Sequence, residues 1–283
     1  MQLQDYRDRW FIHASDNEKL LYVSREKEKR SKAFSPCDMT PDDVDYEMSC
    51  GKNRTMIRIC GMKQDSFEYF VEKYGDTYEY LSFFKSQFIT DFSPLSKLKN
   101  LQGVDIYWNI RADKLWDMSE NTSLEYLNIA DCKKITYDLP MLNTGKSLKC
   151  LQVAGDIFSG YPMKNLHCFS EMESLQQLRL LQIKLEDHDT SFIETLPNLK
   201  HFDFPAGMLL TEEIAYICAK YPALKGTALC AYNTEDAILN DVRICGHRKP
   251  SLDLPQHQKR LDKYVAEFNA LVEKYREELN ILK

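Results

Sequence analysis

The sequence contains little that would carry catalysis or hold a metal ion. The motifs H-E-x-x-H, G-x-S-x-G and G-x-G-x-x-G do not occur, and the six histidines show no spacing typical of metal ligands. Gly145-Lys146-Ser147 resembles the end of a phosphate-binding loop, but Pro140 stands where that loop needs a glycine. We therefore expect no metal, no cofactor and no enzymatic activity of these classes.

Long apolar runs are also missing. No stretch approaches the roughly 20 residues that a membrane-spanning helix needs, and the N-terminus shows no apolar core of a secretory signal. The nine cysteines are an odd number without a C-x-x-C pair, which is the usage expected of reduced thiols. These features predict a cytoplasmic protein that does not enter a membrane and whose cysteines are free.

A concentrated basic surface is missing too. The chain has 37 basic and 43 acidic residues, which gives a net charge of −6. The basic run at 25–32 is interrupted by glutamates and is more simply the solvated face of a helix. Because phosphate binding needs clustered cations, we expect no nucleic-acid partner.

The most informative feature that is present is a repeat, L-x-x-L-x-L-x-x-[N/C], whose clearest copies lie at 101–109 and 124–132. A degenerate copy begins at Arg54. Each unit can bury its apolar positions only against its neighbours, so several copies are expected to stack into one continuous core. The pattern therefore predicts a solenoid, with copies spaced by 23 to 27 residues that begin at Tyr78, Leu101, Leu124, Leu148, Leu175, Leu199 and Leu224.

These copies resemble the leucine-rich-repeat family over 54–247. The resemblance implies an α/β fold, a leucine-rich-repeat solenoid with a parallel concave sheet and an irregular or helical convex side. Segment 89–98 resembles the bacterial internalin repeat, whereas 210–222 resembles a longer repeat with an outer helix.

The resemblance also implies an inward asparagine ladder that hydrogen-bonds the turn after each strand. Asn109 and Cys132 match it, Ser86 and Asp156 match it in part, and the pattern is broken at Ile183, Gly207 and Tyr232. Buried backbone groups need partners, so main chain or water must satisfy these last turns.

The two ends of the chain lack the repeat, and we expect a capping segment at 1–53 and a linker with a capping helix at 248–283. Apolar clusters at 10–12 and 20–23 fit a hairpin or a short helix pair equally well, and Thr40-Pro41 predicts a helix start. The C-terminal part predicts one amphipathic helix with an apolar stripe of Leu261, Tyr264, Val265, Phe268, Leu271, Val272, Tyr275 and Leu279.

This stripe does not persist as heptads, because Glu278 takes the next seam position. Packing onto the last repeat is therefore favoured over a dimeric coiled coil, and we expect a monomer.

The third, fifth, seventh and eighth repeat positions should display side chains on the concave face, where solenoids of this fold commonly bind proteins. Aromatic and carboxylate side chains gather in its first three rows, as in protein-binding hot spots. We predict a non-catalytic interaction module, an adaptor or immunity-type protein, that binds a protein partner through Tyr80, Phe84, Asp105, Tyr107, Trp108, Tyr126, Asn128 and Asp131.

Two alternatives would bury these residues: the N-terminal segment could fold over them, or the register could slip by one residue and exchange the faces of the sheet.

A different function class remains as the alternative, a small-molecule enzyme or sensor that uses Asp105, Asp131 and Tyr107. The best catalytic constellation combines His201, Asp203 and Cys230. Cys230 and His201 would lie four strand residues apart, about 13 Å, whereas a nucleophile and its base must approach within about 3 Å. This distance disfavours catalysis.

Overall fold

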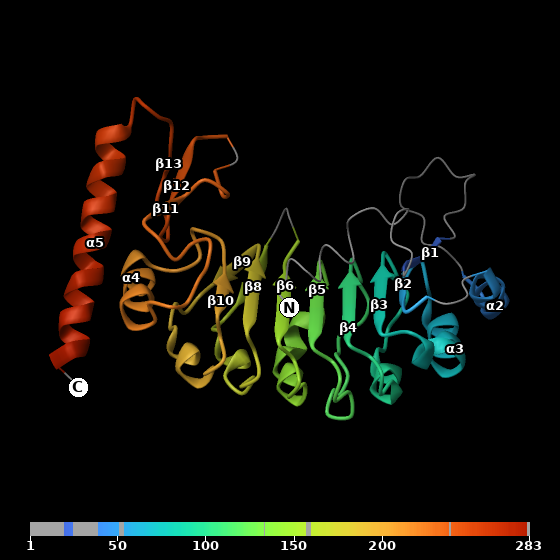
Figure 1. Ribbon diagram of the computed structural model, residues 1–283. Helices are drawn as coiled ribbons and strands as arrows, with labels where there is room; N and C mark the ends of the chain where they lie inside the picture. The colour runs from blue at the N-terminus through green and yellow to red at the C-terminus, as the bar shows by residue number, and fades with distance from the viewer. Residues whose placement is uncertain are drawn as a thin grey trace.

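The protein is an α/β solenoid built on one continuous parallel sheet. The computed structural model describes residues 20–24, 39–50, 54–132, 134–156, 160–237 and 239–281 of the 283-residue chain. Eight strands follow one another across the main sheet (Figure 1). They are β1 (Leu20–Ser24), β2 (Met56–Cys60), β3 (Tyr80–Phe84), β4 (Gly103–Tyr107), β5 (Tyr126–Ala130), β6 (Cys150–Ala154), β8 (Gln177–Leu181) and β10 (His201–Asp203). The predicted parallel sheet is confirmed.

The register of this sheet follows the repeat. Leu81, Val104, Leu127, Leu151 and Leu178, at the fourth repeat position, are aligned across five strands and fully buried. The third positions are aligned on the opposite face and continue to β10, where His201 lies beside Gln177. A slipped register would have exchanged these faces, so that alternative is wrong.

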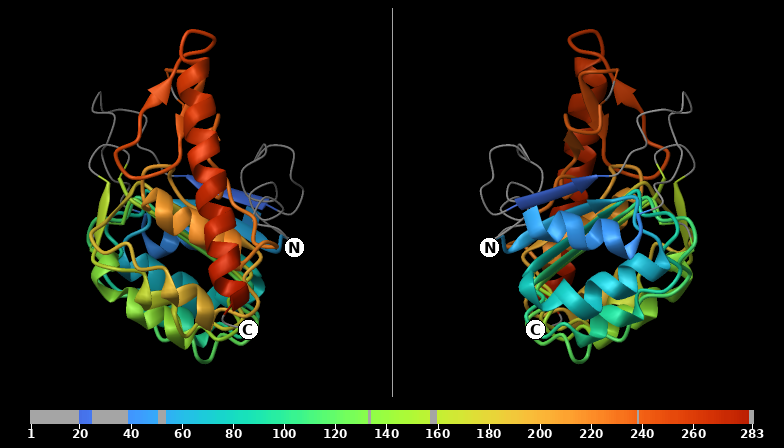
Figure 2. Two further views of the ribbon diagram at one scale, coloured as in Figure 1. Left: turned by 90° about the vertical axis from the view of Figure 1, so that its left-hand side faces the viewer. Right: turned by 90° about the vertical axis from the view of Figure 1, so that its right-hand side faces the viewer.

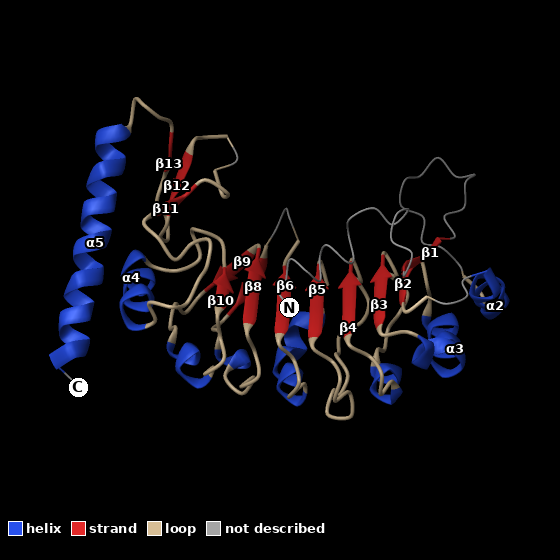
Figure 3. Ribbon diagram, in the orientation of Figure 1, coloured by secondary structure: helices blue, strands red, loops and turns tan. Residues whose placement is uncertain are grey.

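The convex side carries short helices, as Figure 3 shows. The internalin-like segment contains a 3-10 helix and the longer repeat contains an α-helix, as the resemblance implied. The elements are α3 (Gln64–Tyr74), η1 (Gly75–Thr77), η2 (Ser93–Lys97), η3 (Ile135–Thr144), η4 (His167–Phe169), η5 (Ser191–Thr195) and α4 (Thr211–Lys220).

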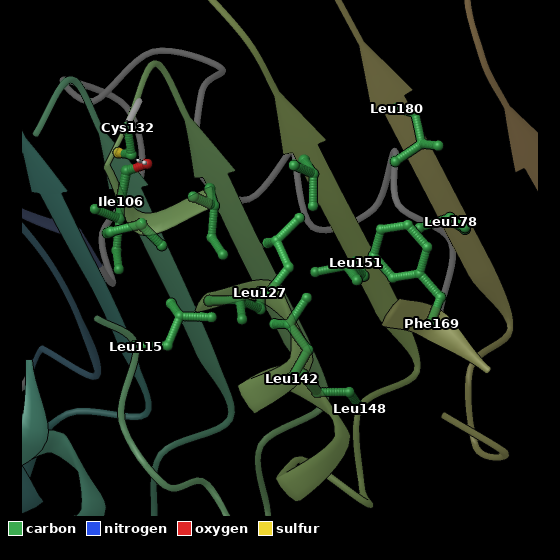
Figure 4. Close-up of a cluster of buried hydrophobic side chains, with 14 of the residues drawn as sticks. Ile106, Leu115, Leu127, Cys132, Leu142, Leu148, Leu151, Phe169, Leu178 and Leu180 are labelled. Carbon is green, nitrogen blue, oxygen red and sulfur yellow. Dashed lines mark hydrogen bonds between the residues drawn. The ribbon is translucent and has the colours of Figure 1, made fainter. Parts of the chain in front are cut away.

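The main core lies between the sheet and these convex turns. Figure 4 shows Leu127 and Leu151 of the sheet meeting Leu142, Leu148 and Phe169 from the convex side. Each of these side chains is buried, and burial of one such side chain contributes on the order of 1.5–3 kcal/mol. The solenoid is therefore held together by contacts between successive repeats.

Asn109 satisfies the turn after β3, as the family resemblance implied. Its Nδ2 donates to the carbonyls of Ser86 and Ile89 at 2.8 and 2.9 Å, and its Oδ1 accepts the N–H groups of Arg111 and Ala112 at 3.0 and 2.8 Å. Cys132 takes the same position in the next repeat, with its Sγ 3.7 Å from the carbonyl oxygen of Ile106.

A second buried amide, Asn121, does the same on the convex side. Its Nδ2 donates to the carbonyls of Leu95 and Leu98, both at 2.9 Å, and its Oδ1 accepts the indole N–H of Trp116 at 2.8 Å. The sequence reasoning missed this residue because it lies outside the nine-residue repeat pattern.

Main chain takes over where the ladder is broken at Ile183. There β7 (Tyr161–Met163) and β9 (Ile183–Leu185) form a separate two-stranded parallel sheet. The Tyr161 N–H donates to the Gln182 carbonyl at 2.7 Å. The predicted substitution of side-chain by backbone partners is confirmed at this turn.

The N-terminal segment contributes a strand and a helix. Residues 20–24 form β1, which pairs in parallel with β2 and so extends the main sheet. The helix alternative is wrong for this cluster, and the hairpin alternative stays a prediction because 10–12 lies outside the described residues. The predicted helix start is confirmed by α2 (Pro41–Cys50). The Thr40 N–H donates to Asp43 Oδ2 at 2.9 Å, and the Asp43 N–H donates to Thr40 Oγ1 at 3.3 Å, which forms a capping box.

The C-terminal helix, α5 (Gln258–Ile281), packs beside α4 at the end of the solenoid (Figures 1 and 2). Tyr275 meets Tyr216 of α4 edge-on, with ring centroids 5.6 Å apart. The upper part of α5 covers a small antiparallel sheet of β11 (Tyr232–Asn233), β12 (Val242–Ile244) and β13 (Ser251–Leu252). The predicted packing of the C-terminal helix is confirmed.

In the described ranges no helix is long and apolar enough to cross a bilayer.

Replacement of the ladder asparagine, Asn109→Ala, should lower the free energy of unfolding by about 3 kcal/mol, because buried backbone groups lose their partners and each unsatisfied group costs about 1–3 kcal/mol. Urea denaturation followed by circular dichroism measures the loss. Asn198→Ala is the matched control, since this exposed amide makes one hydrogen bond, to the Glu173 carbonyl. Equal effects in the two variants would contradict the proposed ladder.

Truncation of Phe268 on α5 tests whether this helix stabilises the solenoid. Phe268 is only 6% exposed, so Phe268→Ala should cost about 3 kcal/mol through lost burial and an added cavity. The neighbouring exposed residue provides the control, Asn269→Ala, which should stay within about 0.5 kcal/mol. If Phe268→Ala unfolds at the same urea concentration as the wild type, α5 does not form a cap.

Candidate functional site

The concave face consists of two parts with different accessibility, a buried layer over the middle of the strands and a half-buried rim at their carboxyl ends. The buried layer contains a polar ladder, defined here as Ser82, Asp105, Asn128 and Gln152. These four residues lie side by side on β3 to β6. The rim is described below.

Hydrogen bonds run along the polar ladder from strand to strand. The Ser82 hydroxyl donates to Asp105 Oδ2 at 2.7 Å, Asn128 Nδ2 donates to Asp105 Oδ1, and Gln152 Nε2 donates to Asn128 Oδ1 at 2.8 Å. Asp105 is 1% exposed. Burial raises the pKa of its carboxyl, while the hydrogen bonds from Ser82 and Asn128 and the charge of Arg58 oppose that rise.

An apolar cluster lies beside the polar ladder. Its residues on β3, β5 and β6 stand two positions before those of the ladder, nearer the amino ends of the strands. It contains Met56, Tyr80, Tyr126 and Cys150, all buried. Gly103 lies between the two tyrosines, and a Cβ placed there would come within 2.6 Å of the Tyr80 ring. Because Gly103 has no side chain, the rings of the two tyrosines on β3 and β5 have room on either side of it.

The expected exposure of Tyr80, Asp105, Tyr126 and Asn128 is wrong, since none of the four is more than 4% exposed. The side chains do lie on the predicted face. Strands only about 4.8 Å apart bring their side chains into contact, and on a concave sheet long side chains crowd one another. Their role in partner binding stays a prediction.

The second part, the aromatic rim, is defined by Phe84, Lys85, Phe88, Tyr107, Trp108 and Arg111. Phe84 and Tyr107 stack with ring centroids 5.1 Å apart and planes 8° from parallel. The Lys85 ammonium lies 5.2 Å from the Phe84 ring centre and 5.4 Å from that of Trp108, and Arg111 lies 4.1 Å over Phe88. The cations of the rim thus lie against its aromatic rings.

Backbone geometry fixes the direction of the rim. Lys85, Trp108 and Asp131 occupy the same repeat position in three repeats and have φ values of 52°, 57° and 54°. This left-handed conformation is uncommon for residues other than glycine. Each N–H donates to the last strand carbonyl of the next repeat, at 2.9 to 3.0 Å, so the turn is held rigidly. The left-handed conformation was not predicted, because none of these three positions holds the glycine or asparagine that is typical of it.

The eight predicted binding residues therefore divide equally. Phe84, Tyr107, Trp108 and Asp131 are half-buried at the carboxyl ends of their strands, and the other four belong to the buried layer. The alternative in which the N-terminal segment, 1–53, covers this face stays a prediction, because of this segment only residues 20–24 and 39–50 are described. Ile110, which follows the rim, is 47% exposed and was missed because it lies beyond the displayed repeat positions.

Among the described residues, no hydrogen bond joins the side chains of His201, Asp203 and Cys230. Asp203 accepts the Thr227 N–H at 3.0 Å, and the Cys230 Sγ lies 3.9 Å from that of Cys245. Within the described residues, no group of three or more histidine, cysteine, aspartate or glutamate side chains could hold a metal ion. The rim offers aromatic faces and cations, which suit recognition.

No protein-family model and no curated protein matches this chain. Among solved structures, it is similar to an internalin (inlF) of Listeria monocytogenes, with 15% identity, a TM-score of 0.44, and coverage of 60% of this chain and 46% of the internalin. The chain has a leucine-rich-repeat fold. This assignment rests on its own repeat period, parallel sheet and Asn109 turn.

Two further structures show the same level of likeness. Internalin C2 of Listeria monocytogenes has 22% identity and a TM-score of 0.39, with 54% of this chain and 62% of that chain covered. A TLR13–ssRNA13 complex has 13% identity and a TM-score of 0.41, with 58% and 26% covered. This chain thus spans less than two thirds of each of the three.

The buried carboxyl of Asp105 predicts a pH dependence of stability. Its raised pKa means that the folded protein holds a proton more tightly than the unfolded chain, whose aspartate titrates near about 3.9. The favourable contribution is therefore complete below about pH 3.9 and is lost as pH rises through the folded-state pKa. Urea denaturation between about pH 4 and 7 should show this loss in the wild type and not in Asp105→Asn. Parallel pH profiles of the two proteins would contradict the assignment.

Proposed function

We propose that this chain is a non-catalytic protein-interaction module, monomeric and cytoplasmic, that acts as an adaptor or immunity-type protein. The aromatic rim carries the proposal. Tyrosine, tryptophan and arginine are enriched among the residues that dominate the binding energy of protein interfaces. Tyrosine and tryptophan bury large areas with few rotatable bonds, and arginine offers a planar group with five hydrogen-bond donors. In the rim these residue types stand together on one rigid turn.

The charge of the rim supports an acidic partner surface. Lys85 and Arg111 lie over aromatic faces, and in the described part of the chain neither forms an ion pair with a carboxylate. Two cations beside aromatic rings on a chain of net charge −6 form a local positive patch. Such a patch favours carboxylates of a partner and accelerates association at low salt.

The enzyme or sensor alternative needs an accessible carboxylate at Asp105. Asp105 is buried, with both carboxylate oxygens accepting hydrogen bonds, so it cannot reach a ligand placed on the concave surface. Tyr107 and Asp131 remain half-buried, but their phenol and carboxylate alone do not supply a catalytic set. We therefore favour the interaction module.

The proposal is tested with a partner captured from the native lysate on purified protein. Tyr107→Ala and Trp108→Ala should each weaken partner affinity by on the order of 30-fold, about 2 kcal/mol, as measured by isothermal titration calorimetry. Their unfolding free energies should change by about 1 kcal/mol or less, because these side chains are only half-buried.

Tyr232→Ala is the matched control, since Tyr232 is an aromatic residue 38% exposed on β11, far along the chain from the rim. It should bind as the wild type does. Undiminished binding by both rim variants would rule out the rim as the interface. A co-purified metabolite in place of a protein would support the sensor alternative.

A further inference from the structure

Two thiols meet where the last repeat joins the antiparallel sheet. Cys230 precedes β11 and Cys245 follows β12, and their Sγ atoms lie 3.9 Å apart. The Cys245 N–H donates to the Ala231 carbonyl at 3.0 Å, which continues the antiparallel pairing of Tyr232 with Ile244. Both thiols are free, as are those of Cys132, Cys168 and Cys218.

The position of the two thiols allows a bond between these sulfur atoms. Cys245 lies opposite Ala231 in the antiparallel pairing, so Cys230 is its diagonal neighbour, and their Sγ atoms are already 3.9 Å apart. The sulfur atoms must approach by about 2 Å to reach the S–S bond length of about 2.05 Å. Rotation of the two side chains can supply this movement while the strand pairing is kept.

The two thiols differ in their surroundings, which assigns them different roles. Cys245 is fully buried, whereas Cys230 is partly exposed. A hydrogen bond between the thiols lowers the pKa of Cys230 and raises that of Cys245, and Asp236 opposes ionisation of both. By contrast, burial raises the pKa of Cys132 and of Cys168 to about 12. Thiolates are the reactive species, so Cys230 is the favoured nucleophile of this group.

A cleft reaches the same site from the side of α5. It has a volume of about 450 Å³ and lies between the amino end of α4, the antiparallel sheet and α5. Its lining includes Cys245, Ala231, Phe268 and Leu271. Cys230 is not part of this lining, so a small molecule meets the Cys230 thiol at its own partly exposed surface, and the cleft leaves space beside Cys245 for the side-chain movement that closes the bond.

We propose that Cys230 and Cys245 form a reversible disulfide site that reacts with low-molecular-weight disulfides. The Cys230 thiolate attacks one sulfur of the small disulfide, which forms a mixed disulfide and releases one small thiolate. Cys245 then gives up its proton and its sulfur attacks Cys230, which closes the protein disulfide and releases the second thiolate. Two protein thiols are oxidised and one small disulfide is reduced to two thiols.

The bond would attach the turn after the last repeat to the sheet that carries α5. It would close a loop between residues 15 apart in the sequence, and such cross-links stabilise mainly by restricting the unfolded chain. The redox state would thus set how firmly the C-terminal cap is held. This inference does not depend on the proposed partner-binding function.

The test uses the full chain in glutathione buffers that range from reduced to oxidised, with thiols then blocked and the protein analysed by intact mass and peptide mapping. We expect one internal disulfide that joins Cys230 to Cys245 and is reversed by reduced glutathione. The melting temperature should rise by on the order of 5–10 °C on oxidation. Peptide mapping that instead finds Cys230 joined to Cys218, or no internal disulfide in the folded protein, would overturn the proposal.

Single replacements separate the two steps. Cys245→Ala should accumulate one glutathione on Cys230, because the resolving thiol is missing, whereas Cys230→Ala should remain unmodified at Cys245. Cys218→Ser is the control, since the Cys218 thiol donates a hydrogen bond to the Leu229 carbonyl. This variant should form the Cys230–Cys245 disulfide as the wild type does. Equal glutathionylation of the Cys230→Ala and Cys245→Ala variants would show that the thiols do not act in the proposed order.

Discussion

The structure depends on the alignment of apolar side chains at equivalent positions of successive repeats. Leu81, Val104 and Leu127 each contact the same position of the next strand, and a single repeat would have nothing to bury them against. This constraint sets the strand spacing and the register. Because side chains alternate along a strand, it also decides which residues appear on the concave face.

The concave face shows the cost of that arrangement for polar groups. Parallel strands align like with like, so Asp105 and Asn128 come to lie beside each other and must be satisfied within the face. They are, through hydrogen bonds that run from strand to strand along the polar ladder. Where β4 ends, Tyr107 and the left-handed Trp108 are half-buried, so part of their aromatic surface stays accessible.

The sequence predicted what depends on periodicity and missed what depends on local geometry. The parallel sheet, the turn at Asn109 and the helix α4 all follow from the repeat pattern and are present. The parallel pairing of β1 with β2 was not predicted, because a single apolar cluster does not reveal its pairing partner. Burial of Tyr80 could not be predicted either, since a face assignment does not determine how closely neighbouring side chains pack.

The two proposed sites are separated by several strands in a solenoid in which each repeat contacts only its neighbours. The rim depends on β3, β4 and β5, whereas Cys230 and Cys245 join the last repeat to the cap. Between them, β6, β8 and β10 are stabilised by their own leucine and phenylalanine contacts. Because coupling in a solenoid passes between neighbouring repeats, we expect a disulfide to act on the C-terminal end and to leave the geometry of the rim unchanged.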